Sequence, residues 1–283
     1  MPPNRDLHIE SMGPRDAAIS LVFMHGPGLD HTCFRPFVEP LSRDYQLIFY
    51  DARLCGHSAR SSARTVDLDL LADDLEMVAT TSATGAVVAV AHSFAPLVAL
   101  QAARRVNTAL KGLILVAPGI SNSIGATLLD HARVNGTAEQ RLCLEAAFGG
   151  SITTDDELAR VWRTILPLYV SHYADQIEAD LLGDMSFSAF AFNSFLQYAV
   201  GRLDGMAAFA QLRMPSLVIV GAHDWIESDP SGSSRALREA NPKADVHVLE
   251  STGHFPFAEK PEAFVHVIAD WLTEHEREIT APL

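Results

Sequence analysis

The sequence has few cysteines, and they form no recognisable pattern. Cys33, Cys55 and Cys143 are the three cysteines of 283 residues; they form no CxxC pair and have no histidine at metal-ligand spacing. This scarcity excludes a disulfide scaffold and suits a reducing compartment. It also gives no reason to expect a metal ion, and we expect no cofactor.

Positive charge and long apolar runs are scarce as well. Lysine and arginine total 21 against 35 acidic residues, so the net charge is −14. An acidic surface of this kind repels nucleic-acid phosphates and anionic lipid headgroups. The N-terminal MPPNRDLHIE lacks the apolar segment of a signal peptide, and no uncharged apolar run reaches about 18 residues. We expect a cytoplasmic protein that binds neither nucleic acid nor membrane.

Short apolar runs bounded by turn residues alternate with helical patterns along the chain. Runs that are apolar at nearly every position predict strands covered on both faces, as in parallel sheets, at residues 19–24, 46–50, 86–91, 112–116, 216–220 and 245–249. Helical spacing occurs at residues 66–80, 96–106 and 261–271. The alternation predicts an α/β fold with a mostly parallel central sheet flanked by helices.

One long segment breaks this alternation. Residues 121–204 contain no strand-like run, only helical patterns at residues 138–148, 155–169 and 187–200. We therefore predict a catalytic core in two parts, residues 1–120 and 205–283, with a helical lid over residues 121–204. The aromatic side chains of this lid would either roof an apolar pocket or attach the lid helices to the core: Phe187, Phe190, Phe192, Phe195 and Tyr198.

Ser93 occupies the most informative local motif, a turn between a predicted strand and a predicted helix. A serine on so tight a turn projects its hydroxyl at the carboxyl edge of the sheet, and only small residues fit two positions to either side. Those residues are Ala91 and Ala95, and Pro96 suits a first helical turn. Taken alone, the motif would also fit a plain helix cap.

Two later loops supply an acid and a base. Asp224 and His254 each follow the carboxyl end of a predicted strand, so both are expected at the same edge of the sheet as Ser93. The chain order serine, aspartate, histidine is that of a catalytic triad on this type of sheet. We predict Ser93 as nucleophile, His254 as general base and Asp224 as the acid that orients it. Structural roles are expected for the other histidines near these loops or in the strands: His25, His31, His92, His223 and His247.

These features together resemble the α/β-hydrolase fold superfamily over nearly the whole chain. The HGPG segment at residues 25–28 resembles its oxyanion loop, and DARLCGHS at residues 51–58 resembles its D-x-R-G-x-G-x-S turn. In motif style the sequence is most similar to the proline iminopeptidase branch, whose loop reads HGGPG. The resemblance implies an α/β-hydrolase fold with an inserted helical lid.

The resemblance also implies an oxyanion hole, formed by Phe94 together with Gly26, Pro27 and Gly28. The N–H of Phe94, directly after the nucleophile, is the expected first donor. In relatives the second donor usually comes from the residue after His-Gly, but Pro27 has no N–H. Gly28 or a shift of the loop would have to replace it. Leu54, in place of the glycine after the arginine, is a further departure from the family pattern.

The expected function is cofactor-independent hydrolysis of a small ester, lactone, thioester or amide, through an acyl-enzyme. One alternative is a proline iminopeptidase-like aminopeptidase, in which lid carboxylates hold the substrate's ammonium group; the candidates are Glu145, Asp155, Asp156, Glu157, Asp175, Glu178 and Asp180. Another is a lyase, cyclase or oxygenase of the same fold that uses His254 and Asp224 for proton transfer. A non-catalytic binder is a third. The expected partner is a small-molecule substrate, and the sequence allows a homodimer.

Overall fold

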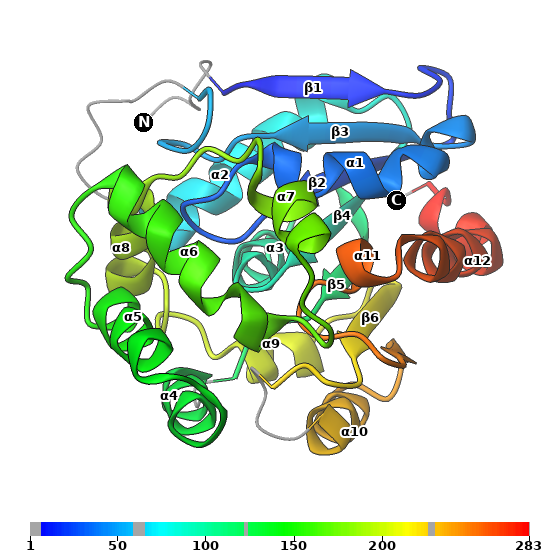
Figure 1. Cartoon of the computed structure of the whole chain (residues 1–283). Helices are drawn as coiled ribbons and strands as arrows, with labels where there is room; N and C mark the ends of the chain where they lie inside the picture. Colours follow the sequence, from blue (N-terminus) through cyan, green and yellow to red (C-terminus); the bar gives the residue numbers. More distant parts are fainter. Residues whose placement is uncertain (1–6, 59–65, 122–123, 226–229, 283) are drawn as a thin grey trace.

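A computed structural model describes residues 7–58, 66–121, 124–225 and 230–282 of the chain (Figure 1). Its sheet has the strand order β1-β3-β2-β4-β5-β6-β7, parallel except where β1 pairs with β3. The strands are β1 (Ile9–Met12), β2 (Ile19–Met24), β3 (Gln46–Tyr50), β4 (Ala86–His92), β5 (Leu110–Val116), β6 (Ser216–Gly221) and β7 (Asp245–Leu249).

The strands predicted from apolar runs are confirmed, and β1 was missed. The run at residues 112–116 begins two residues earlier in the structure, at Leu110. β1 is only four residues long and half-buried, so it lacks the continuous apolar pattern of the covered strands. β7 forms the other edge of the sheet, and its exposure alternates along the strand.

Helices cover both faces of the sheet. In Figure 1, α2 and α3 lie on one side of the central strands and α12 on the other. α2, α3, α9 and α10 pack in series on the first face, while α1, α11 and α12 contact one another on the second. Their bounds are α1 (Arg35–Val38), α2 (Leu68–Ser82), α3 (Ala95–Ala103), α9 (Gly205–Ala210), α10 (Pro230–Ala240), α11 (Pro256–Glu259) and α12 (Pro261–Ile279). No helix in the described part of the chain is both long enough and apolar enough to cross a membrane.

The chain between β5 and β6 contains most of the remaining helices. They are α4 (Ile124–Asn135), α5 (Ala138–Phe148), α6 (Asp155–Tyr169), α7 (Asp175–Leu182) and α8 (Ala189–Tyr198). The predicted bounds of α5 and α6 agree with the structure because threonines mark their starts: Thr137 and Thr154 each accept a backbone N–H of the first turn. In Figure 1, α4, α5, α6 and α8 gather on the side of the molecule away from α12, whereas α7 lies nearer the centre and contacts α11. We call residues 121–204 the helical insertion.

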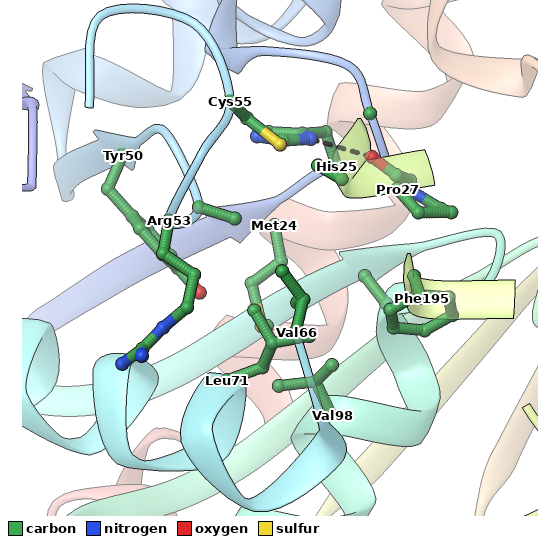
Figure 2. Close-up of a pocket in the computed structure, with 15 residues that line it drawn as sticks. Met24, His25, Pro27, Tyr50, Arg53, Cys55, Val66, Leu71, Val98 and Phe195 are labelled. Carbon is green, nitrogen blue, oxygen red and sulfur yellow. Dashed lines mark hydrogen bonds between the residues drawn. The ribbon is translucent and has the colours of Figure 1, made fainter. Parts of the chain in front are cut away.

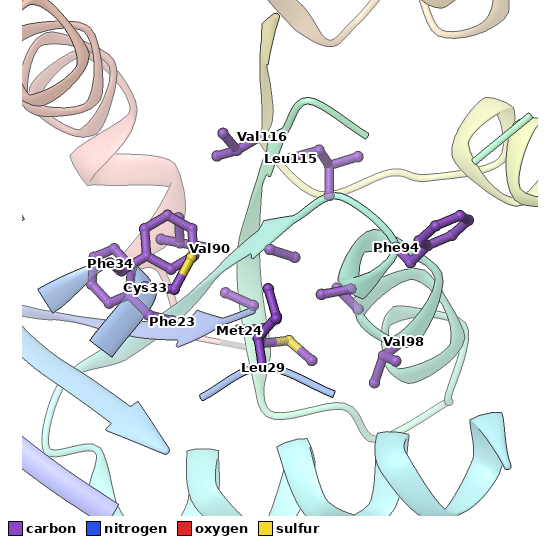
Figure 3. Close-up of a cluster of buried hydrophobic side chains, with 14 of the residues drawn as sticks. Phe23, Met24, Leu29, Cys33, Phe34, Val90, Phe94, Val98, Leu115 and Val116 are labelled. Carbon is purple, nitrogen blue, oxygen red and sulfur yellow. The ribbon is translucent and has the colours of Figure 1, made fainter. Parts of the chain in front are cut away.

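Aromatic packing fixes the loops near the carboxyl edge of the sheet. Phe23 on β2 stacks on Phe49 of β3 with ring centroids 5.0 Å apart. Phe34, in the loop after β2, lies 5.3 Å from Phe23 and 4.4 Å from Phe257 of α11. Figure 3 shows this cluster continuing through side chains of the central strands and α3, among them Val90, Leu115, Phe94 and Val98. Each buried ring contributes about 1.5–3 kcal/mol, so the loops have a rigid base.

Candidate active site

Ser93 lies on a strained turn between β4 and α3. Its backbone has φ of 64°, a left-handed conformation that costs a non-glycine residue roughly 1–3 kcal/mol. Two hydrogen bonds hold the turn: Ser93 N–H donates to Val116 O at 3.0 Å, and Gly119 N–H donates to Ser93 O at 2.6 Å. Ala91 and Ala95 are buried on either side, as the small-residue pattern predicts. The strained conformation is held because Ser93 N–H is hydrogen-bonded to Val116 at the end of β5.

The structure brings the three residues predicted as nucleophile, base and acid into one hydrogen-bonded line. His254 Nε2 lies 3.0 Å from Ser93 Oγ, and His254 Nδ1 lies 3.0 Å from Asp224 Oδ2. All three residues are buried. With Nδ1–H donated to the carboxylate, Nε2 is left to accept the serine proton, which is the arrangement general-base activation requires.

The loop that carries His254 is fixed by residues that the sequence reasoning did not identify. Glu259 Oε1 accepts the N–H groups of Gly253 at 2.8 Å and Phe255 at 3.3 Å, so one carboxylate oxygen spans both neighbours of His254. Its other oxygen accepts Ser171 N–H from the helical insertion at 2.7 Å. His254 N–H donates to Tyr169 O at 2.7 Å. A glutamate shortly after the histidine was the only sequence signal, and such residues are common on exposed helices.

His92 supports the same loop from the strand side. Its Nε2–H donates to His254 O at 2.8 Å, and the two rings are 4.7 Å apart. Burial lowers the pKa of His92 well below the ordinary 6.5, with the neighbouring His254 adding to the effect. His92 is therefore a neutral donor at physiological pH, which confirms the structural role predicted for it.

The oxyanion loop places Gly26 beside the serine and turns Gly28 away from it. A Cβ at Gly26 would lie 3.9 Å from Ser93 Oγ, so the glycine permits close approach of a substrate. Gly28 has φ of 74°, and its carbonyl accepts the N–H of Ser188 in the helical insertion at 2.8 Å. Burial raises the pKa of the Cys55 thiol to about 12, an effect that the nearby backbone of Gly28 partly opposes. Gly28, the candidate to replace the N–H missing at Pro27, is therefore held against the helical insertion through its carbonyl.

An apolar cavity opens over Ser93. Ser93, His92, Trp162 and Tyr169 carry its polar side-chain groups, and most of the other walls come from the helical insertion; the lining is Gly26, Pro27, Leu29, His92, Ser93, Phe94, Leu128, Ala147, Phe148, Leu158, Val161, Trp162, Ile165, Tyr169, Phe192 and Phe255. Of the insertion aromatics considered from sequence, Phe192 lines this cavity, whereas Phe190 is 49% exposed.

A second apolar cavity shares Gly26 and Pro27 with the first. Figure 2 shows its walls from the oxyanion loop, the D-x-R turn, α2, α3 and α8; they are Met24, His25, Gly26, Pro27, Gly28, Tyr50, Ala52, Arg53, Cys55, Val66, Leu71, Ala95, Val98, Ala191 and Phe195. Arg53 is the charged side chain of this lining, and Asp74 binds it through two hydrogen bonds of 2.6 Å. The guanidinium is thus paired within the fold and braces the D-x-R turn against α2.

Asp51 braces the D-x-R turn. Burial alone would raise its pKa, but hydrogen bonds from the His31 ring and from the N–H groups of His57 and His31 lower the pKa of Asp51 to about 2. Leu54 has φ of 67°, which explains why the family pattern favours glycine there. The turn is therefore built for rigidity.

The other histidines near these loops also have structural partners. His25 Nδ1–H donates to Gly26 O at 2.8 Å, and burial lowers the pKa of His25 below 6.5. His223 Nδ1 lies 2.6 Å from Ser171 Oγ in the helical insertion. His247 is exposed on β7. Among the described residues, none of these rings forms a hydrogen bond with Ser93, so His254 remains the candidate base.

Comparison with known proteins agrees with this fold. The family model described as "Alpha/beta hydrolase family" matches residues 21–267. The chain belongs to the alpha/beta hydrolase family. A proline iminopeptidase from Heyndrickxia coagulans is a relative, 23% identical over 276 residues that cover 89% of this chain and 90% of that protein. The predicted superfamily is thereby confirmed.

Other members of the family differ widely in length. The AB hydrolase superfamily protein YclE from Bacillus subtilis is 25% identical over 247 residues, 85% of this chain and 88% of YclE. Polyketide synthase ThaQ from Burkholderia thailandensis is 27% identical over 263 residues, which cover 93% of this chain but only 12% of the synthase. The structure of MenH from S. aureus superposes with a TM-score of 0.76 at 19% identity, covering 95% of this chain and 99% of MenH. This last likeness shows the fold alone.

Proposed function

We propose that the protein is a cytoplasmic, cofactor-independent serine hydrolase that acts on a small ester, lactone, thioester or amide with an apolar acyl group. The observation that carries this proposal is the buried line of Ser93, His254 and Asp224, whose two contacts are both 3.0 Å. Ser93 lies on a strand-to-helix turn under an apolar cavity, and acyl transfer needs a nucleophile placed in this way.

The mechanism follows from the proton each group can hold. His254 Nε2 takes the proton of Ser93 as Oγ attacks the substrate carbonyl, and Asp224 stabilises the imidazolium that forms. When the tetrahedral intermediate collapses, His254 returns the proton to the leaving group and an acyl-enzyme remains. Water, deprotonated by the same imidazole, then releases the acid and restores Ser93.

Phe94 is the proposed first oxyanion donor. It is the N-cap of α3, so its N–H has no partner within the helix. The second donor would come from residues 26–28, and Gly28 is the candidate because Pro27 has no N–H. Losing one donor typically costs about 3–4 kcal/mol of transition-state stabilisation, so the position of the Gly28 N–H would control the rate.

The helical insertion acts as the lid in this proposal, between core segments 1–120 and 205–283. It supplies most of the apolar wall over Ser93 and contacts the His254 loop through Tyr169 O. An apolar substrate would thus be enclosed by the same segment that positions the base. Substrate choice is set by this wall rather than by the fold.

The aminopeptidase alternative has less support. No aspartate or glutamate lines either cavity in the described residues, so nothing there would hold a substrate ammonium group. Several of the acids considered from sequence have other partners: Asp155 accepts Ala189 N–H, Glu178 accepts the Tyr173 hydroxyl, and Asp180 accepts the Gln176 amide.

Proton-transfer chemistry is the second candidate, and one observation favours it. Pro27 has no N–H, so the position that usually supplies the second oxyanion donor in this family cannot do so here. Abstraction of a proton from carbon by His254 develops less charge on that oxygen. Ser93 would then serve as a hydrogen-bond donor to the substrate.

A substrate panel separates these functions. The enzyme is assayed with p-nitrophenyl esters from acetate to octanoate and with proline p-nitroanilide. We expect turnover of the esters, with a burst of one nitrophenol per chain in rapid mixing, and no turnover of the proline amide. Hydrolysis of the proline amide alone would favour the aminopeptidase. Absence of any turnover or burst by folded protein would contradict acyl transfer.

A further inference from the structure

A second group of histidines lies at the β1 edge of the sheet. His8 directly precedes β1, His31 follows β2, and Asp51 and His57 lie in the turn after β3. The pairing of β1 with β3 brings them together, because Asp51 N–H donates to His8 O at 3.1 Å. One metal-ligand atom from each of these four residues lies within 4.8 Å of the others. We call these residues the edge cluster.

Electron pairs converge in this cluster. His31 Nδ1–H donates to Asp51 Oδ1 at 2.8 Å, which leaves the lone pair of a neutral His31 on Nε2. That nitrogen lies 3.5 Å from Glu10 Oε1, and the same oxygen lies 3.2 Å from His8 Nε2. Arg35 contacts the other oxygen of Glu10, Oε2, at 3.2 Å. Acceptors that converge in this way are stable only with a cation or with protons between them.

The hydrogen bond between His31 and Asp51 has the form found behind metal-bound histidines. A ligating imidazole usually donates its second N–H to a carboxylate, which fixes the tautomer and the ring orientation. Asp51 also accepts the backbone N–H of His31 at 2.9 Å and of His57 at 2.7 Å. Asp51 therefore orients the His31 ring and holds the backbone of His57, whose ring nitrogen Nδ1 lies 3.7 Å from Asp51 Oδ2.

The spacing suits a small transition-metal ion. Ligand atoms about 2.0–2.1 Å from a tetrahedral zinc are about 3.3 Å from one another, close to the separations of Glu10 Oε1 from His8 and His31. The His57 side chain is 66% exposed, so it has room to rotate toward the others. A set rich in imidazole suits zinc, copper or nickel better than magnesium or calcium.

We propose that the edge cluster, with Glu10, binds one zinc ion or a similar divalent transition-metal ion per chain. His8, His31 and His57 supply nitrogen ligands, Glu10 supplies an oxygen, and Asp51 orients His31. The ion would join the edge strand to the loops after β2 and β3, which also carry the oxyanion loop and the D-x-R turn. Protons on the imidazoles would satisfy the same carboxylates without a metal, and the experiment must separate these two cases.

The test is a zinc titration of tag-free, chelator-treated protein, followed by isothermal calorimetry. We expect one zinc per chain, no comparable binding of magnesium, and a rise in Tm of roughly 5 °C at about a hundredfold excess over Kd. His57→Ala and His8→Ala should each weaken zinc binding by about 100-fold or more, because loss of an orienting partner alone costs about 10–100-fold.

A matched control is His266→Ala on α12. His266 is an exposed imidazole 3.2 Å from the Asp270 carboxylate. Such an isolated histidine–aspartate pair would bind zinc more weakly than the edge cluster. Its removal should leave zinc binding unchanged. The Tm of each metal-free variant shows that it folds, and the visible spectrum of the cobalt-loaded protein reports imidazole ligation directly. Zinc binding that is absent, or equal in wild type, His57→Ala and His8→Ala, would overturn the proposal in favour of protonated imidazoles.

Discussion

The centre and the β1 edge of the sheet both place histidine against a buried aspartate, but in different ways. At the centre, one buried imidazole is held between Asp224 and the hydroxyl of Ser93. At the edge, three imidazoles, of which His31 is buried and His57 is exposed, converge with carboxylates, and none of these rings faces a hydroxyl as His254 faces Ser93 in the described residues. The first arrangement suits transfer of one proton, whereas the second suits binding of a cation. In the two proposals, the same pair of residue types would serve different chemistries according to which group faces the second nitrogen of the imidazole.

The histidines around the two sites also differ in charge. Burial lowers the pKa of His25 and His92 near the centre, so both are neutral at physiological pH. At the edge, the hydrogen bond to Asp51 raises the pKa of His31. The two histidine rings that pack near the central line are therefore neutral, whereas His31 at the edge takes up a proton more readily than an ordinary histidine.

The largest expected effect comes from removing the central hydroxyl. Ser93→Ala should lower kcat for a p-nitrophenyl ester by about 10⁶-fold, since a triad without its nucleophile retains only binding and oxyanion support. Steady-state kinetics with that ester measures this. His247→Ala, an exposed imidazole on the strand before His254, is the control and should leave kcat unchanged. Near-normal ester turnover by Ser93→Ala would mean that the central site is not catalytic, so the two sites would no longer differ in this respect.

Asp224→Asn should reduce kcat by about 10⁴-fold. The amide keeps the shape of the side chain but favours the wrong tautomer of His254, because it can donate to Nδ1. Comparison with exposed Asp270→Asn, by the same kinetics, isolates the effect of the charge. A loss under tenfold would mean that the carboxylate does not orient the base.

Acid should lower the free energy of unfolding because His25 and His92 are buried as neutral rings. Because the folded pKa values of His25 and His92 lie below the ordinary 6.5, the unfolded chain takes up protons first as pH falls below this value. Their contribution to stability is full above pH 6.5 and is lost below it, by up to about 2.7 kcal/mol per pH unit for the pair. Urea denaturation across this range tests the slope, and His92→Gln should roughly halve this contribution. An unchanged slope in His92→Gln would contradict this assignment.

Glu259→Gln should lower kcat about tenfold with little change in KM. The variant weakens the acceptor that holds the N–H groups on both sides of His254, so the base is displaced while the apolar cavity is kept. The exposed Glu262→Gln on α12 is the matched control. If KM alone rose, Glu259 would act on substrate binding and not on the position of the base.

The smallest effect on catalysis is expected at the edge. His57→Ala should change kcat by less than about twofold in metal-free protein, because its exposed side chain contacts no residue of the central line. The same ester assay measures this. A large loss in a folded variant would show that the two regions are coupled, and the contrast between them would fail.

Most of the sheet and the central line could be predicted because each depends on a local pattern. Continuous apolar runs mark the covered strands, and Ser93 and Asp224 each follow one of them, while His254 follows the half-exposed edge strand β7. β1 could not be found in this way because it is short and only half-buried. The predicted lid boundaries follow from the missing strands, and the role of the lid stays a prediction.

The remaining features depend on contacts between distant segments. The edge cluster joins His8, His31, Asp51 and His57 from three segments without regular spacing, so the sequence predicted no metal site. Glu259 acts through backbone N–H groups, which leave no mark on residue type. Features that depend on contacts between distant segments therefore could not be predicted from local motifs.

Covalent labelling with a fluorophosphonate probe, followed by peptide mass mapping, shows whether Ser93 is a nucleophile activated by His254. We expect one adduct per chain, on Ser93, with labelling lost in His254→Ala and retained in His247→Ala. A folded protein that takes up no probe, or an adduct at any other residue, would contradict the assignment of Ser93 as an activated nucleophile.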